Sequence, residues 1–133
     1  MRPTRFQDLA VDLVKNTPGV THVSTLAEAG DTKHPGGLAI TTGSISTRWQ
    51  IIGQLAPGEK HSDPDSPVQG EAFHTWTEPE NSDHEGLLAM VLAQAKSPEI
   101  HDVERWSTRS EGKSKQGLTI LFHNGARAFV RKL

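Results

Sequence analysis

The chain contains no cysteine. This absence excludes disulfide bonds, a thiol nucleophile, cysteine-ligated zinc and iron–sulfur clusters. A sequence without cysteine is typical of proteins that work in a reducing compartment, so we expect a cytoplasmic location. The composition predicts no cofactor.

Long apolar runs are also missing. The longest, 87–93, is far shorter than the roughly 20 residues that a helix needs to cross a bilayer. Residues 1–8 do not form the apolar stretch of a secretory signal. We therefore expect no association with a membrane.

Aromatic residues are scarce. They make up 5% of the 133 residues, tyrosine is absent, and hydrophobic residues as a whole reach 34%. The length is that of one ordinary domain, which buries roughly two thirds of the surface exposed by its unfolded chain. We expect a single domain, 1–133, with a lean hydrophobic core.

Charge is nearly balanced overall but unevenly distributed. Residues 1–55 carry five basic and four acidic side chains, 56–85 carry one and eight, and 86–133 carry eight and four. The middle of the chain is therefore acidic and the last third is basic.

The acidic segment 56–82 is predicted to be one long loop. Its prolines, which fix φ and remove backbone donors, are Pro57, Pro64, Pro67 and Pro79. Phe73 and Trp76 are large apolar groups that a solvated linker seldom carries. We expect the part of the loop around them to pack on the rest of the domain.

A weak internal repeat relates the two flanking segments. A shift of 79 to 80 positions places Leu9 on Leu88, Leu13 on Leu92, Gly37 on Gly117, Ile40 on Ile120 and Trp49 on Phe129. The pattern predicts two α-β-β-β units, 1–55 and 83–133, joined by the acidic loop.

Each unit begins with a predicted helix. Thr4 and Gln7 have the spacing of a capping box, apolar residues follow at helical intervals, and the helix is expected to end near Asn16. Ser82 to Glu85 can cap the second helix, which runs until Ser97 and Pro98. The second helix is apolar on most sides, so we expect it to be the more deeply buried.

Six strands are predicted, at 20–27, 38–42, 45–55, 100–109, 118–123 and 126–132. Gly43-Ser44 and Asn124-Gly125 tolerate positive φ and are typical of hairpin turns. Short turns join antiparallel neighbours, so the fold class is α+β, with an antiparallel sheet covered on one face by two helices.

Histidines and carboxylates near the acidic loop raise the possibility of a metal-dependent hydrolase. The candidate ligands are His61, Asp63, His74 and His84. Their spacing matches no known ligand pattern, and a solvated loop is the favoured interpretation. Patterns of nucleases, serine hydrolases and phosphate-binding loops are not found, so we expect a protein that is not an enzyme.

The basic last third suggests a second function, nucleic-acid binding. Arg127 and Arg131 alternate with Phe129 along one strand face, an arrangement that can pair phosphates and stack bases. The candidate cations are Arg105, Arg109, Arg127, Arg131 and Lys132.

The favoured function is recognition of a protein or peptide partner, by a homodimer formed through the uncovered sheet face. In one mode an extended segment adds to the sheet beside Trp49 and Phe129. In the other the loop meets a basic partner. The predicted contact residues are Trp49, Phe129, Trp76, Asp63, Asp65, Glu78 and Glu80.

The order of elements resembles that of small acidic secretion chaperones, which also have a similar length and net charge. The resemblance implies a dimer that holds its partner in extended form. This chain departs from the pattern because it ends in a predicted strand and carries the long acidic loop.

Overall fold

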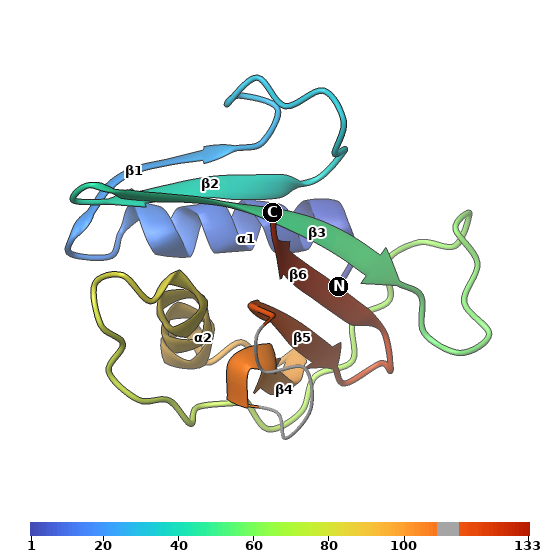
Figure 1. The fold of residues 1–133 in the computed structure, drawn as a ribbon. Coiled ribbons are helices and arrows are strands. Elements are labelled where there is room, and N and C mark those ends of the chain that lie inside the picture. Colours follow the sequence, from blue (N-terminus) through green and yellow to red (C-terminus); the bar gives the residue numbers. More distant parts are fainter. Residues whose placement is uncertain (109–114) are drawn as a thin grey trace.

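The computed structural model describes residues 1–108 and 115–133, and it has two helices on one face of a six-stranded antiparallel sheet (Figure 1). The helices are α1 (Pro3–Lys15) and α2 (His84–Ala95). The strands are β1 (Val20–Thr25), β2 (Gly37–Thr42), β3 (Ile45–Gln54), β4 (Ile100–Arg105), β5 (Gly117–Phe122) and β6 (Arg127–Lys132). The predicted fold class is confirmed.

The sheet order is β1-β2-β3-β6-β5-β4, so the last strands of the two halves pair at its centre. Both edge strands come directly after a helix. Leu38 and Leu118 turn their side chains into the core from β2 and β5. The alternation of apolar residues along these strands is thus explained by one covered face.

The strand register corrects one match of the predicted internal repeat, the one between Trp49 and Phe129. Leu38 pairs with Trp49, whereas Leu118 pairs with Val130. Val130 is therefore the counterpart of Trp49, and Phe129, the predicted counterpart, points to the opposite face. Leu38 and its partner in β3 are one residue closer in sequence than Leu118 and its partner in β6. A shift of one residue exchanges the two faces of a strand.

The start of α1 differs from the one predicted, whereas the cap of α2 lies within the predicted segment from Ser82 to Glu85. Pro3 occupies the first turn of α1, and Arg2 is the cap residue without a side-chain cap bond. Gln7 does not complete a capping box, because its side-chain oxygen accepts from the backbone N of Gly37 at 2.8 Å. In α2 the cap is Asp83, which accepts from Gly86 N at 2.8 Å.

Helix α2 is the more buried helix, as predicted. All its residues from His84 to Ala93 are buried, whereas α1 buries only Phe6, Ala10 and Val14. Within the described residues, no helix combines the length and apolar content needed to span a membrane.

Strand β4 is shorter than predicted. It ends at Arg105, and Trp106–Thr108 form a short 3₁₀ helix. At the end of the strand, the side chain of Arg105 forms ion pairs with Asp83 and Glu85. Trp106 then lies over Gly117, where an added Cβ would come within 2.3 Å of the indole ring.

Candidate functional site

A groove opens between α2, β4 and the loop segment 73–77, and we call it the α2–β4 groove. Its volume is about 440 Å³, which lies within the usual range for binding sites. Its apolar lining residues include Phe73, Trp76, Met90 and Val103. Its polar lining residues include Asp102, Glu104 and Arg105.

Backbone hydrogen bonds hold the loop beside β4 and so form one wall of the groove. Gly70 N donates to Pro98 O at 2.7 Å, and Phe73 N donates to Ile100 O at 3.2 Å. Phe73 also packs against the hydrophobic core. The expectation that this part of the loop packs on the domain is therefore confirmed. Trp76 remains 40% exposed at the groove.

The charged groups around the groove are mainly acidic. Glu71, Glu78 and Glu80 are exposed on the loop that flanks Trp76. Asp102 lies within the groove, and its Oδ1 accepts from Val103 N at 2.9 Å. Among the described residues, none of these four carboxylates has a basic partner within 4 Å.

A second hollow continues the groove along α2. It has a volume of about 420 Å³, shares Met90 with the α2–β4 groove, and includes Glu78 and the end of α1. An apolar surface with acidic neighbours therefore extends over more than one turn of α2. This length suits a chain segment better than a compact ligand.

Arg105 is the cation in the groove, and its charge is already neutralised. Its Nε donates to Glu85 Oε1 and its Nη2 donates to Asp83 Oδ2, both at 2.9 Å. Burial alone would lower the pKa of Arg105, but the two carboxylates hold the pKa above its usual value. Arg105 thus gives the groove a fixed wall rather than a free positive charge.

Glu85 is the buried anchor of this wall. It is only 1% exposed. Besides the guanidinium of Arg105, its carboxylate accepts from the hydroxyl and backbone N of Ser107 and from Gly117 N, which lies at 2.9 Å. A buried carboxylate is stable only with such charge-assisted bonds. Glu85 therefore joins the start of α2 to the ends of β4 and β5.

His84, a candidate metal ligand, has both ring nitrogens occupied. It is 1% exposed, and its ring contacts the hydroxyls of Thr42, at 2.7 Å from Nε2, and Thr47. Trp49 Nε1 donates to the Thr47 hydroxyl, and the Thr42 hydroxyl donates to Asn81 O. This row of hydrogen bonds starts at the indole N–H of Trp49, which can only donate, and ends at the carbonyl of Asn81, which can only accept. A neutral ring with its proton on Nε2 therefore completes all four contacts.

The charge state of His84 agrees with that arrangement. Burial lowers its pKa, the positive charge of Lys132 lowers it further, and Asp83 opposes these effects. The ring is therefore uncharged at neutral pH and supports the fold.

The remaining metal candidates do not meet. His61, Asp63 and His74 are exposed on the long loop. Over residues 1–108 and 115–133, no three histidine or carboxylate side chains lie close enough together to hold an ion. The structure therefore does not assemble the proposed ligand set.

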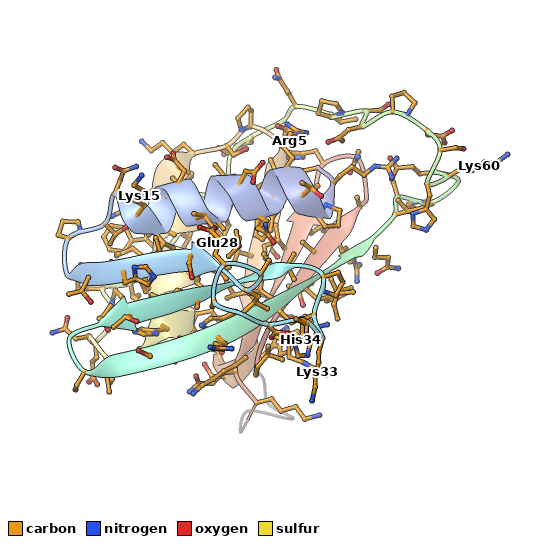
Figure 2. The ribbon with its side chains drawn as sticks, turned by 90° about the horizontal axis from the view of Figure 1, so that it is seen from above. Arg5, Lys15, Glu28, Lys33, His34 and Lys60 are labelled. Atoms are coloured by element: carbon orange, nitrogen blue, oxygen red, sulfur yellow. The ribbon has the colours of Figure 1, made fainter. Side chains whose placement is uncertain are left out.

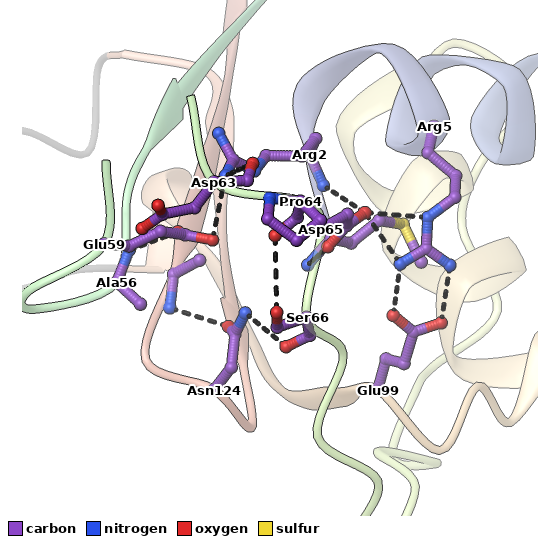
Figure 3. Close-up of polar contacts among 12 residues, drawn as sticks. Arg2, Arg5, Ala56, Glu59, Asp63, Pro64, Asp65, Ser66, Glu99 and Asn124 are labelled. Carbon is purple, nitrogen blue, oxygen red and sulfur yellow. Dashed lines mark hydrogen bonds and ion pairs between the residues drawn. The ribbon is translucent and has the colours of Figure 1, made fainter. Parts of the chain in front are cut away.

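Two of the acidic residues proposed to bind a partner, Asp63 and Asp65, accept hydrogen bonds within the chain (Figure 3). Asp65 Oδ2 accepts from Arg5 Nε at 3.0 Å and from Arg2 N at 3.2 Å. Burial would raise the pKa of Asp65, but these two donors lower it. Asp63 closes a turn by accepting from Lys60 N at 2.8 Å.

Arg5 extends this cluster toward β4. Its Nη1 and Nη2 donate to the two carboxylate oxygens of Glu99, at 2.9 and 2.6 Å (Figure 3). The bidentate pair raises the pKa of Arg5. The first part of the acidic loop is thereby tied to α1 and to the segment before β4.

Trp49 does not lie on the uncovered face, where partner binding beside it was expected. It is 0% exposed in the core. Phe129 does face the uncovered side, where it pairs with Ile52 and is only partly exposed. The sequence could not distinguish the two positions, because an aromatic residue suits either face of a strand.

The candidate nucleic-acid residues have different surroundings. Arg105 is ion-paired, and Arg109 lies outside the described residues. Arg127 and Arg131 are exposed on either side of Phe129, with no acidic partner within 4 Å in the described chain. Lys132, together with Arg131 and Trp106, lines a hollow of about 450 Å³.

Sequence reasoning missed the groove residues Met90, Asp102 and Val103, and it missed Glu85, which holds Arg105 in the groove wall. One signal was present, since Glu85 begins an otherwise apolar helix, where a charged side chain needs a buried partner. Nothing in the sequence places its partner, Arg105, opposite it.

The comparisons with known proteins identify no relative. No family model, no curated protein and no solved structure matches the chain.

Proposed function

We propose that the protein is a non-enzymatic binding domain that recognises a segment of a partner protein in the α2–β4 groove. The observation that carries the proposal is the half-exposed indole of Trp76, set in an apolar groove with acidic neighbours. These features favour a segment that carries both apolar and basic side chains.

The recognition would have two components. Apolar side chains of the partner would cover Phe73, Trp76 and Met90, and burying apolar surface yields about 25 cal/mol per Å². Basic side chains would approach Glu78, Glu80 and Asp102 and stack on the face of Trp76. Cation–π contacts of this kind contribute about 0.5 to 2 kcal/mol.

The test is a titration of the protein with a labelled synthetic peptide of leucine and lysine, followed by fluorescence anisotropy. Trp76→Ala should weaken binding about tenfold or more, because aromatic anchors dominate interfaces. Ile45→Ala is the matched control, since Ile45 is also 40% exposed but lies at the β2–β3 turn. Equal affinity for a leucine and glutamate peptide would contradict the proposed charge selection.

Nucleic-acid binding is the second candidate, favoured by Arg127 and Arg131 on the uncovered face. Phe129 lies between them, and the three side chains could hold phosphates and a base. Two features oppose nucleic-acid binding. The neighbour of Phe129 on β3, Ile52, is aliphatic, and β4 carries the acidic residues Asp102 and Glu104. Binding of a single-stranded oligonucleotide that weakens steeply with salt and is lost in Arg127→Ala would support this second function.

We also infer that the two halves form an internal repeat. Leu26 covers Gly37, and Trp106 covers Gly117. Leu26 and Trp106 are 80 positions apart, and so are Gly37 and Gly117. Both edge strands carry a register irregularity at matching places, between Val20 and His22 and between Ile100 and Asp102. The cytoplasmic location stays a prediction.

A further inference from the structure

A hollow of about 450 Å³ lies where β5 begins and β6 ends, and we call it the Trp106 hollow. Its described lining residues are Trp106, Lys115, Gln116, Arg131, Lys132 and Leu133. The volume lies within the usual range for small-molecule sites. Among the described residues, the Trp106 hollow shares none with the α2–β4 groove. It is therefore a separate candidate site.

The Trp106 hollow is positively charged. Lys115, Arg131 and Lys132 are all exposed at it, and in the described chain none of them has a carboxylate within 4 Å. No described lining residue is an aspartate or a glutamate. Even with the terminal carboxylate of Leu133 counted, the lining has a net positive charge. Cations gathered in a hollow without acidic partners attract an anion.

The indole of Trp106 is held in place beside these cations. Its Nε1 donates to the hydroxyl of Thr119 at 2.9 Å. The ring lies against the backbone of β5 at Gly117, where an added Cβ would come within 2.3 Å of Cε3 and 2.6 Å of Cζ3. The half-buried ring also lines the hollow, so part of its surface faces a ligand there. A rigid aromatic surface next to cations suits a ligand that has both a planar ring and negative charge.

The first half of the chain has a hollow at the matching place, but it carries no charge. Gly37 pairs with Gln50, and Gly117 pairs with Arg131. The hollow beside Gly37 has a volume of about 420 Å³, and none of its described lining residues is charged. Lys33, which lies close by in sequence, does not line it and extends away from the domain (Figure 2). Where the second half has Lys115, Gln116, Arg131 and Lys132, this hollow is lined by Pro35, Gly36, Gln50 and Ile51.

This internal comparison separates the shape of the hollow from its charge. The arrangement of the strands accounts for a hollow in both halves. It does not account for the cations and the indole, which the second half alone provides.

We propose that the Trp106 hollow binds a small ligand of nucleotide size that carries phosphate groups and an aromatic ring. The planar guanidinium of Arg131 would donate to phosphate oxygens, and Lys115 and Lys132 would add positive charge. The ring of the ligand would lie against the indole of Trp106. This proposal is independent of the α2–β4 groove.

The placement of the cations favours a small ligand over a nucleic-acid strand. Arg127 is the other exposed cation on the same face of β6, but it does not line the hollow. It lies four residues from Arg131, which is roughly 13 Å along a strand. The lining cations therefore gather at one end of β6 and do not follow a path across the sheet.

The test is isothermal titration calorimetry with three probes, adenosine 5′-diphosphate, adenosine and inorganic pyrophosphate. We expect adenosine diphosphate to bind most tightly, because it alone engages both the cations and the indole. Arg131→Gln gives β6 the residue found at the matching place in β3, and it should weaken binding about tenfold or more. Arg127→Gln is the matched control, since it removes the same charge from the same strand face outside the hollow. It should leave the affinity unchanged.

Trp106→Leu tests the aromatic contact separately. Leu26 covers Gly37 at the matching place in the first half, so leucine suits the packing there. This variant should lose about fivefold or more of its affinity for adenosine diphosphate and bind pyrophosphate as the wild type does. Circular dichroism reports whether each variant folds.

Four results would overturn the proposal. The first is a folded protein that does not bind adenosine diphosphate, and the second is adenosine that binds as tightly as its diphosphate. The third is an equal loss of affinity in Arg131→Gln and Arg127→Gln, which would show a general effect of surface charge. The fourth is a single-stranded oligonucleotide that binds more tightly than adenosine diphosphate and is weakened by Arg127→Gln, which would assign this surface to nucleic acid instead.

Discussion

Glu85 and Arg105 form an ion pair between the first turn of α2 and the end of β4, with 2.9 Å between Oε1 and Nε. Glu85 is almost completely buried, and Arg105 lines the α2–β4 groove. The pair therefore connects the packing of the core to the shape of the proposed binding site.

Loss of this carboxylate should destabilise the protein strongly. Glu85→Ala leaves Arg105 without its buried partner and Gly117 N without an acceptor, and such changes cost about 3 to 5 kcal/mol. The free energy of unfolding in urea measures the effect. Glu78→Ala, which removes an exposed carboxylate, should change it by less than about 0.5 kcal/mol. Similar values for the two variants would show that Glu85 has no structural role.

Trp49→Ala should reduce stability rather than partner binding alone. Trp49 fills the core and donates to Thr47, so its truncation should cost about 3 to 5 kcal/mol. Phe129→Ala should cost less, because Phe129 is partly exposed on the other face. Thermal and urea unfolding of both variants compare them. A fully stable Trp49→Ala protein would contradict the placement of this side chain.

Protonation of His84 should make the fold less stable in acid. The folded state lowers the pKa of this ring below its usual 6.5. Between the folded pKa and 6.5, the unfolded chain therefore binds more protons than the folded protein. The contribution of His84 is complete above pH 6.5 and is lost as the pH falls from 6.5 toward the folded pKa. An NMR titration of the ring nitrogens measures this directly, and it should find the proton on Nε2 at neutral pH. A ring that titrates at or above 6.5 would contradict the hydrogen-bond chain.

Arg5→Ala should release the first part of the acidic loop with little loss of stability. Arg5 is nearly half exposed, and exposed ion pairs contribute only about 0 to 1 kcal/mol. Without it, Asp65 and Glu99 lose their shared cation, and tryptic cleavage after Lys60 should become faster. Arg48→Ala is a control on the other side of the sheet, and it should leave the rate of that cleavage unchanged.

The fold class could be predicted because local signals and burial agree. Alternating apolar residues along 38–42 and 118–123 mark strands with one covered face, and Asn124-Gly125 marks a hairpin. The cap of α1 was predicted wrongly because a tertiary contact decides it. Gln7 binds Gly37 N, a group 30 residues away, instead of its own helix.

The candidate site could be predicted only in part. Trp76, Glu78 and Glu80 were identified because a large aromatic among charges is unusual in a solvated loop. Asp65 was misjudged, because a sequence does not show which carboxylates an arginine elsewhere in the chain will bind. Met90 and Val103 are buried core residues that also line the groove, and nothing in the sequence distinguishes them from other core residues.

Binding of a basic, apolar protein segment in the α2–β4 groove is tested most directly by NMR mapping. The amide spectrum of the labelled protein is recorded while the leucine and lysine peptide is added. We predict that the largest shifts occur at Phe73, Trp76, Met90 and Val103. Shifts confined to Arg127, Phe129 and Arg131, or no shifts at any peptide concentration, would contradict the claim.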